Sequence, residues 1–208
     1  IGAAVTDGQH DVMLFSVAGM AVRFDENDVR PMGRQARGVR GMNLDEGQAV
    51  IAMLVAPAES AETESSVAEG DVPPVGSVLT ATENGYGKRT PISEYTRHGR
   101  GTKGMIAIQT SERNGRVVAA ALVSPEDEIM LITTGGVLIR TRVAEIREMG
   151  RATQGVTLIN VDEGTKLSGL QRIVESDADN GSGAEEGEAG DDAAGATDAG
   201  ATDADANS

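Results

Sequence analysis

One stretch decides how the organisation of this chain is interpreted: Gly33-Arg34-Gln35-Ala36-Arg37-Gly38-Val39-Arg40-Gly41. Its three arginines bind phosphate well, and its three glycines let the backbone turn tightly and approach a ligand closely. Taken alone, the stretch is typical of a solvated loop, because Gly/Arg-rich turns are common on protein surfaces. However, the sequence pattern around this stretch is repeated, so that the chain contains three copies of it.

The glycines reveal an internal repeat. Each of three apolar runs is followed by a glycine, a base four residues later, a Gly-Arg pair at fourteen residues and another glycine at nineteen. The members are Gly19, Arg23, Gly33-Arg34 and Gly38; Gly85, Arg89, Gly99-Arg100 and Gly104; and Gly136, Arg140, Gly150-Arg151 and Gly155. Three copies with the same offsets indicate a repeated structural unit.

Each copy also carries strand signals. After the third glycine come a strand-like run, a turn rich in Gly, Asn and Asp, and a second apolar run. These pairs of runs are 39–44 and 50–55, 105–110 and 117–123, and 156–161 and 167–174. The spacing is 66 residues between the first two copies and 51 between the last two, and the excess in the first spacing matches the 58–75 insertion. A period near 50 residues is the size of a four-stranded propeller blade. Only 143–149 and its counterparts have room for a helical turn, so we predict an all-β fold.

The repeat predicts blades at 11–57, 76–125 and 126–174, preceded by the last strand of another blade within 1–10. Residue 1 is not methionine, so we expect the chain to begin inside a larger protein. The 58–75 insertion predicts a mobile acidic loop, and 175–208 predicts a disordered acidic tail. Neither segment has enough apolar residues to offset the entropy of ordering.

The net charge of −15 is unevenly distributed along the 208 residues. The tail 175–208 holds eleven acids and the insertion 58–75 holds five, and neither holds a base. The remaining body has 17 acids and all 18 bases, so its net charge is about +1. The acidic composition therefore does not exclude nucleic-acid binding by the body.

Two further features favour a reducing, cytoplasmic location. The chain has no cysteine, which excludes a disulfide framework. It also has no apolar run of the length that spans a membrane.

Several motifs give the chain a specific resemblance to a known family. They are Val12-Met13-Leu14-Phe15, Asn84-Gly85-Tyr86-Gly87-Lys88-Arg89-Thr90, Thr102-Lys103-Gly104 and Met149-Gly150-Arg151-Ala152-Thr153-Gln154-Gly155-Val156. With the repeats, they closely resemble the C-terminal domain of the DNA gyrase A protein over roughly residues 1–174. The resemblance implies a β-pinwheel, a propeller-like disc of four-stranded blades in which neighbours exchange a strand. This chain would supply the last three blades and the acidic tail.

The family carries a box, Gln-basic-Arg-Gly-Gly-basic-Gly, in its first blade, where it is required for DNA wrapping. The box-like motif here matches at Gln35, Arg37, Gly38, Arg40 and Gly41. Ala36 and Val39 replace a base and a glycine. The resemblance therefore implies a degenerate copy on a later blade, which puts its importance for wrapping in doubt.

The recurring bases predict a duplex-binding rim, because binding that does not read sequence needs an array of bases directed at phosphates. The predicted DNA-binding residues are Arg23, Arg34, Arg37, Arg40, Lys88, Arg89, Arg97, Arg100, Lys103, Arg140, Arg142 and Arg151. In the alternative interpretation, Arg34, Arg100 and Arg151 pair with acids between blades. The few aromatics, Phe15, Phe24, Tyr86 and Tyr95, argue against a stacking platform for single strands.

No catalytic residue, metal site or cofactor is predicted. His10 and His98 have no cysteine partner and no acidic residues at metal-ligand spacing. The glycine-rich turns lack the Gly-x-x-x-x-Gly-Lys-Ser/Thr pattern of nucleotide binding. The family cleaves DNA with a tyrosine that follows an arginine, and neither Tyr86 nor Tyr95 has that context.

The resemblance implies a DNA-wrapping segment that binds and bends duplex DNA and so directs negative supercoiling by a type II topoisomerase. Its partners would be duplex DNA, the rest of the gyrase A protein, and the gyrase B protein in a heterotetramer. Two alternatives remain. One is the related C-terminal domain of topoisomerase IV, which selects DNA substrates; the other is a propeller-type protein-interaction module whose arginines are structural. The near-intact box-like motif and the regular repeats favour the first interpretation over topoisomerase IV.

Overall fold

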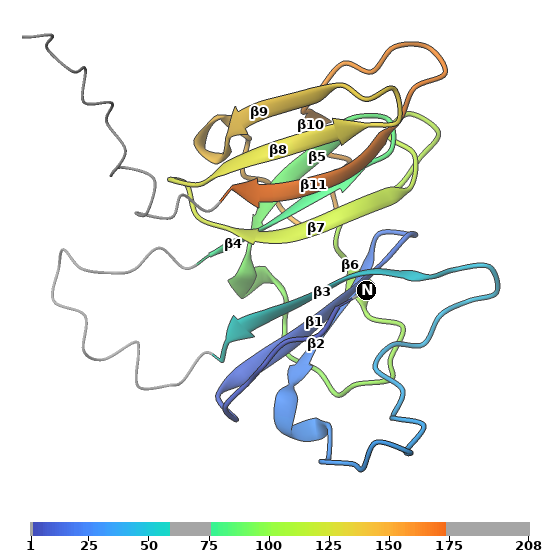
Figure 1. Ribbon diagram of the computed structural model, residues 1–208, viewed down its shortest axis with the longest axis vertical. Coiled ribbons are helices and arrows are strands. Elements are labelled where there is room, and N and C mark those ends of the chain that lie inside the picture. The colour runs from blue at the N-terminus through green and yellow to red at the C-terminus, as the bar shows by residue number, and fades with distance from the viewer. Residues whose placement is uncertain (1, 59–75, 174–208) are drawn as a thin grey trace, which may run out of the picture. The chain divides into compact units, whose positions relative to one another are not determined.

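The computed structural model describes residues 2–58 and 76–173, and these residues form an all-β fold (Figure 1). Their strands build three antiparallel sheets that follow one another along the chain. The acidic tail and all but the first residue of the acidic insertion lie outside the described residues. The predictions made for those two segments therefore stay predictions.

Each sheet is built around a central hairpin. The first sheet has the order β3-β1-β2-β6, with β1 (His10–Ser16), β2 (Met20–Asp25), β3 (Val50–Pro57) and β6 (Met105–Ile106). The second has the order β10-β5-β4-β7, with β4 (Ser77–Thr82), β5 (Tyr86–Pro91), β7 (Val117–Val123) and β10 (Val156–Thr157). The third has the order β11-β8-β9, with β8 (Glu128–Thr133), β9 (Leu138–Arg142) and β11 (Leu167–Ile173). One 3-10 turn follows each hairpin, namely η1 (Glu26–Asp28), η2 (Ile92–Glu94) and η3 (Val143–Glu145), as the sequence predicted for these positions.

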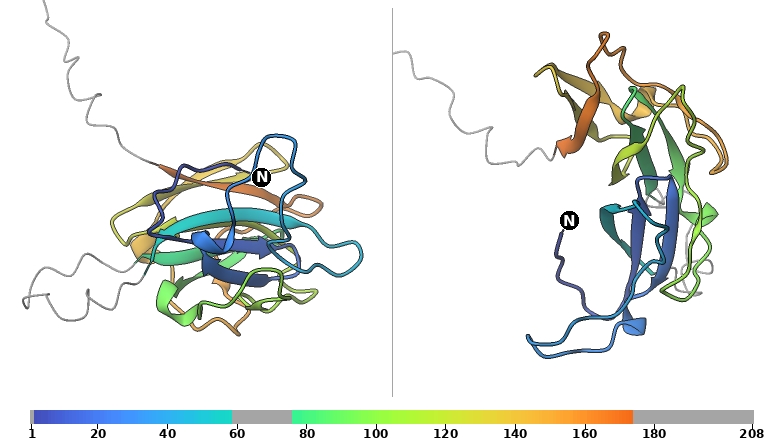
Figure 2. Two further views of the ribbon diagram at one scale, coloured as in Figure 1. Left: turned by 90° about the horizontal axis from the view of Figure 1, so that it is seen from below. Right: turned by 90° about the vertical axis from the view of Figure 1, so that its right-hand side faces the viewer.

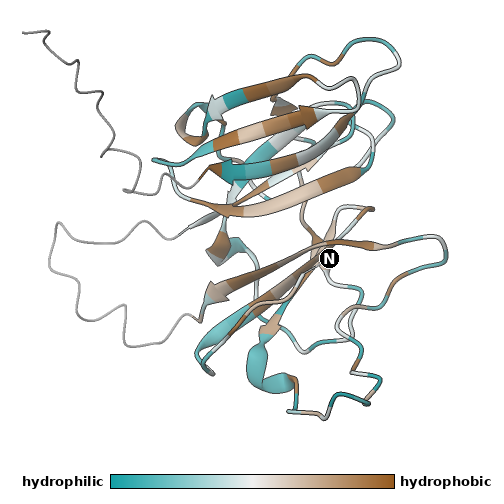
Figure 3. Ribbon diagram, viewed as in Figure 1, coloured by the Kyte–Doolittle hydropathy of each residue, from teal (hydrophilic) through white to brown (hydrophobic). Residues whose placement is uncertain are grey.

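Strand β1 shows why these sequences form sheets. Its side chains alternate, so that Met13 and Phe15 join a core shared with the second sheet, where Phe15 packs edge-on against Tyr95. Val12 and Leu14 point to the opposite face and pack in a separate cluster around Phe24. Figure 3 shows the same trend over the structure, with apolar residues concentrated on the strands and polar residues on the connections.

Neighbouring sheets share cores. Leu79 of the second sheet packs in one cluster with Ile129 and Leu131 of the third. Strand β3 lies beside β7, and β7 lies beside β11, as Figures 1 and 2 show from several sides. The sheets are therefore packed on one another rather than strung apart.

The first glycine of each repeat sits in the turn of its hairpin with a positive φ, which is +80° at Gly19 and +81° at Gly85. At these two glycines the following repeat also passes close to the turn. The carbonyl oxygen of Gly85 accepts hydrogen bonds from the backbone N–H groups of Leu158 and Ile159, at 2.8 and 3.2 Å. A Cβ atom at position 85 would overlap with the carbonyl oxygen of Ile159. Glycine is thus required both by the turn and by the contact between repeats.

The fourth strand of the first two sheets comes from the following repeat. Strand β6 pairs Met105 with Ala21, and β10 pairs Val156 with Gly87. This confirms the exchange of strands between neighbouring blades that the resemblance implied. Within the described residues, the third sheet has only three strands.

Two predicted strands are not formed. Residues 39–44 make a single parallel bridge, between Met42 and Thr102, and residues 2–9 contain no strand. The runs 105–110 and 156–161 shorten to two residues each, in β6 and β10. A strand requires a partner edge along its length. In the described residues, 2–9 and 39–44 lack such an edge, so their β-forming composition was not sufficient.

Candidate nucleic-acid interface

Bases gather on the connections that follow the three 3-10 turns, at 29–41, 96–104 and 147–155. We call these nine residues the basic band: Arg30, Arg34, Arg37, Arg40, Arg97, Arg100, Lys103, Arg147 and Arg151. The three connections contain one acid, Glu148. A chain with a net charge of −15 thus keeps these connections almost free of acids.

Hydrogen bonds join the first connection to the second, and the third connection to β6, which directly follows the second. Arg100 Nη1 donates to the carbonyl oxygen of Arg40 at 3.2 Å, and the N–H of Gly101 donates to the carbonyl oxygen of Gly41 at 2.6 Å. In the next repeat, Arg151 Nη1 donates to the carbonyl oxygen of Ile106 at 3.1 Å. Each of the last two connections is therefore hydrogen-bonded to the repeat before it.

Three arginines in and beside the box-like motif are an accessible part of the band. Arg34, Arg37 and Arg40 are exposed, and none has a carboxylate within ion-pair distance among residues 2–58 and 76–173. Gly38 has a φ of +80° with no atom near its missing Cβ, so it serves the turn rather than a close contact. The exposed cations can neutralise phosphate without first breaking an ion pair.

Two members of the band are partly committed to acids. Arg97 Nη2 lies 2.6 Å from Asp11 Oδ1, and Lys103 Nζ lies 2.7 Å from Asp45 Oδ1. Asp11 is completely buried, so its pair with Arg97 is structural, whereas the Lys103 pair is exposed and weak.

The structure corrects the assignment of Arg23 to a DNA-binding rim. Its side chain is 2% exposed, and its Nε lies 2.7 Å from Asp11 Oδ2. Its Nη1 donates to the carbonyl oxygens of Ile92 and Tyr95, both at 3.1 Å, in the next repeat. A buried guanidinium in such a network joins two repeats and is not available to phosphate.

The equivalent arginines show the same role, modified by their surroundings. Arg89 is half-buried, and its Nε donates to the carbonyl oxygen of Ile146 at 2.7 Å, again in the next repeat. Arg140 is half exposed and pairs with Glu128 on its own sheet, and Arg142 lies 3.9 Å from the same carboxylate. At Arg23 and Arg89 this recurring position is therefore a joint between repeats, whereas at Arg140 it carries an ion pair within one sheet.

Lys88 is a second correction. Its side chain is 0% exposed, and its Nζ donates to the carbonyl oxygens of Gly150 and Arg151 and to Thr153 Oγ1. It cannot touch DNA directly in this structure.

The alternative interpretation of Arg100 and Arg151 was right about bridging and wrong about the acceptors. Both residues are half-buried and reach the preceding repeat. Their side chains donate to backbone carbonyl oxygens and not to carboxylates. Arg100 donates to those of Asp28 and Arg40, and Arg151 donates to that of Ile106. Arg34 makes no such bridge within the described residues and stays exposed.

Two bases of the band were missed in the sequence. Arg30 and Arg147 are exposed, and each stands eleven residues after the first glycine of its repeat, Gly19 and Gly136. The same register that found the other arginines would have found them. The second repeat has Thr96 at this position, which hid the pattern.

The aromatic residues offer no exposed platform within the described residues. Phe15, Phe24 and Tyr95 are buried, and burial raises the pKa of the Tyr95 hydroxyl. The Tyr86 ring is covered by the guanidinium of Arg113, 4.7 Å from the ring centroid. Base stacking of the kind that single-strand binders use has no surface here.

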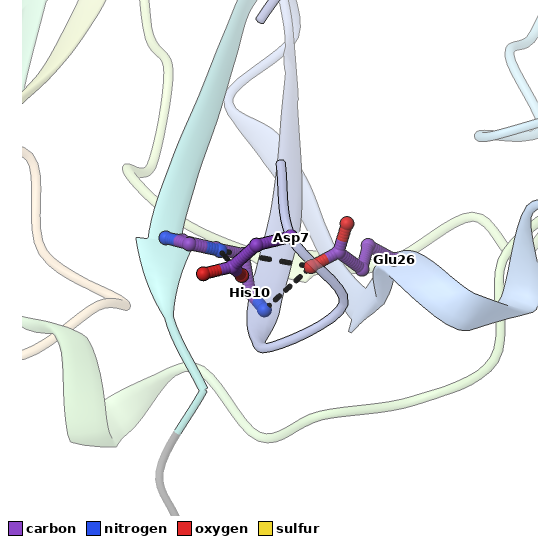
Figure 4. A group of neighbouring side chains, drawn as sticks. All are labelled: Asp7, His10 and Glu26. Atoms are coloured by element: carbon purple, nitrogen blue, oxygen red, sulfur yellow. Dashed lines mark hydrogen bonds and ion pairs between the residues drawn. The ribbon is translucent and has the colours of Figure 1, made fainter. Parts of the chain in front are cut away.

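The sequence predicted no acidic residues at metal-ligand spacing around His10, but the structure places two acids beside it (Figure 4). His10 Nδ1 lies 2.9 Å from Asp7 Oδ1 and 3.6 Å from Glu26 Oε1, and the His10 N–H donates to Glu26 Oε1. The turn before β1 and the start of η1 bring these groups together, across a sequence distance that local spacing does not reveal. Hydrogen bonds within the cluster account for its geometry.

None of the helical turns in residues 2–58 and 76–173 is long or apolar enough to cross a membrane.

A family model described as the DNA gyrase C-terminal domain, beta-propeller, matches residues 10–57, 76–124 and 127–173. The chain is 48% identical over 188 residues to the DNA gyrase A protein of Pseudomonas aeruginosa, covering 90% of this chain and 19% of that protein. It is 48% identical over 175 residues to the DNA gyrase A protein of Escherichia coli K12, covering 84% of this chain and 18% of that protein. The chain thus spans about a fifth of the length of these relatives.

Solved structures agree with this fold. The structure of a DNA gyrase A C-terminal domain matches with a TM-score of 0.68 at 28% identity, covering 82% of this chain and 52% of that chain. The crystal structure of a DNA topoisomerase IV C-terminal domain matches with a TM-score of 0.68 at 24% identity, covering 81% of this chain and 48% of that chain, which shows a shared fold. Three sheets, the first two of them completed by an exchanged strand, the family match over most of the described residues and the sequence identity lead to one conclusion: the chain belongs to the β-propeller family of DNA gyrase C-terminal domains.

Proposed function

We propose that this segment binds and bends duplex DNA along the basic band, and so directs negative supercoiling by a gyrase complex. The observation that carries the proposal is the composition of the basic band, whose nine bases and single acid lie on three equivalent connections, the last two of them hydrogen-bonded to the preceding repeat. Binding of this kind depends on phosphate contacts and not on base edges.

The proposal for the wider assembly is supported by the relatives, which are DNA gyrase A proteins. In this proposal the partners are duplex DNA, the rest of the gyrase A protein, and the gyrase B protein in a cytoplasmic heterotetramer. The segment itself contributes DNA geometry rather than catalysis, and it uses no cofactor.

The band can be tested by replacing Arg34, Arg37 and Arg40 together with alanine and titrating a duplex at several salt concentrations. We expect weaker binding and a log–log salt slope smaller by about 3, since each lost phosphate contact removes about 0.9. These arginines are exposed, so folding should not change. Charge reversal at Arg100 or Arg151 is a poorer test, because both also bridge repeats.

The matched control replaces Lys166 and Arg172, two exposed bases of the third repeat outside the band that pair with Glu83 and Asp127. Their loss should leave the affinity and slope nearly unchanged. Equal effects of both sets of substitutions would show that charge alone, and not the band, determines binding.

The acidic tail, with eleven acids and no base, is proposed to compete with phosphate for the band. Deleting residues 175–208 should then raise the affinity for duplex at low salt and change the salt slope. An unchanged titration would reject competition and leave the band itself untouched.

A further inference from the structure

Lys88 sits in a buried site made by two repeats. It lies on β5, with no exposed surface, and its Nζ points into the loop that follows η3. Two backbone carbonyl oxygens, of Gly150 and Arg151, and the hydroxyl of Thr153 accept its hydrogen bonds. An ammonium has three N–H donors, so all of them are satisfied here.

The three acceptors surround Arg151, a member of the basic band. Lys88 donates to the carbonyl oxygens of Gly150 and Arg151. The backbone N–H of Arg151 donates to Glu94 Oε2 at 3.0 Å. Thr153 Oγ1 also donates to the carbonyl oxygen of Gly150 at 2.9 Å, which closes the loop. Both the N–H and the carbonyl oxygen of Arg151 are therefore hydrogen-bonded.

The lysine at this point is specific to one repeat. The equivalent positions, three residues after Gly19 and Gly136, carry Val22 and Ile139, which cannot donate such bonds. Burial lowers the pKa of Lys88 to about 8, with Glu94 opposing and Arg151 adding to this effect. Burying a cation is costly unless its hydrogen bonds are made, so an apolar residue would fill the space more cheaply. What lysine adds is control of the loop.

We propose that Lys88 is a positioning residue for duplex binding, which acts from the interior by holding the Gly150–Thr153 loop so that Arg151 meets a phosphate. The inference rests on the proposed function of the basic band. It places a residue without any DNA contact among those that set the affinity.

A double-mutant cycle tests this dependence. Lys88→Met and Arg151→Ala are made singly and together in the same chain, and duplex affinity is measured from 50 to 200 mM salt. Each single change should weaken binding by roughly fivefold to tenfold at 0.1 M salt and lower the salt slope by about 1. The double variant should bind like Arg151→Ala alone, because Lys88 acts through that residue.

The matched comparison pairs Lys88→Met with Arg37→Ala, in the first repeat, where the two effects should add. Unchanged affinity in a folded Lys88→Met variant would overturn the proposal. So would effects of Lys88→Met and Arg151→Ala that simply add.

A measurement on the unaltered chain covers the case in which Lys88→Met does not fold. The Lys88 ammonium protons should exchange slowly with water by NMR, and the Arg151 amide, which donates to Glu94, should be protected, whereas Lys103, with a 62% exposed side chain, should exchange fast. Fast exchange at Lys88 would reject the positioning role. Failure of the unaltered chain to bind duplex at any salt would instead reject the proposed function, and the NMR result would still report on the loop.

Discussion

At the scale of single residues, equivalent positions in the repeat differ according to what the next repeat places beside them. Gly85 and Gly136 share a φ of +81°, yet only Gly85 is crossed by the backbone of a following repeat. Arg23 and Arg140 occupy the same place in their hairpins, yet one is buried between repeats and the other is half exposed. The repeat register predicts the residue type, and the neighbour determines its role.

The glycine pair gives a first prediction. Gly136→Ala should lower the free energy of unfolding by about 1 to 2 kcal/mol, the cost of a left-handed conformation without a clash. Gly85→Ala adds a collision with the carbonyl oxygen of Ile159, so its loss should be at least about 3 kcal/mol. Urea unfolding of both variants measures the difference, and equal losses would show that the contact between repeats relaxes freely.

The arginine pair gives a second. Arg23→Met leaves Asp11, which is 0% exposed, without one of its two cations, and should cost about 3 kcal/mol of stability. Arg140→Met breaks a largely solvated pair and should cost less than about 1 kcal/mol. Chemical denaturation followed by circular dichroism compares them. If Arg140→Met proved the more costly, the assignment of Arg23 as the joint between repeats would be wrong.

Lys88 makes stability depend on alkaline pH. Its folded pKa is about 8, whereas an unfolded lysine keeps its proton up to about pH 10.4. Between these values the unfolded chain binds more protons, so the contribution of Lys88 to the free energy of unfolding should rise with pH, by about 1 to 2 kcal/mol from pH 8 to 9.5. The quantity to measure is the stability of the unaltered chain minus that of Lys88→Met at each pH. A difference that falls with pH would contradict the lowered pKa.

At the scale of elements, the hairpins could be predicted from the sequence, but the fourth strand that completes a sheet could not. The alternation around Met13 and Phe15 and the glycine turns are local signals, so β1 to β3 and their equivalents could be placed from the sequence. The fourth strand depends on an edge supplied by another repeat, which explains why 39–44 failed to form a strand and why β6 and β10 are only two residues long.

In the candidate site, too, features set by local sequence were predictable, and features set by contacts with another repeat were not. The exposed Arg34, Arg37 and Arg40 could be chosen from charge and glycine content alone. The burial of Arg23 and Lys88 could not, because their acceptors, such as Tyr95 and Arg151, lie more than sixty residues away in the chain.

Strand β9 gives a prediction at this scale. Its outer edge has no partner strand within the described residues, and Leu138 and Ile139 on it are exposed, as is Val137 just before it. An unpaired apolar edge promotes association between chains. Leu138→Lys, at a side chain that is 60% exposed, should reduce self-association in sedimentation velocity without loss of stability. Val29→Lys, an exposed apolar residue outside any strand, should change association little; an equal reduction would indicate a charge effect unrelated to the edge.

At the scale of the whole molecule, the described residues 2–58 and 76–173 behave as one compact unit, because each pair of neighbouring sheets shares a core. We therefore expect a single cooperative thermal transition, with calorimetric and van't Hoff enthalpies that agree. Two resolved transitions, or hydrogen exchange that opens the third sheet well before the first, would show that the sheets fold independently.

Because strands are exchanged, one copy of the sequence repeat does not coincide with one sheet of the structure. Each copy completes the sheet of the copy before it, through β6 or β10, and fits the same glycine of that sheet. Removal of one entire copy from the middle of the chain would bring a similar segment to the same edge, so the gap would close. Gene duplication and deletion can thus change the number of sheets in such a protein without leaving one unfinished in the interior.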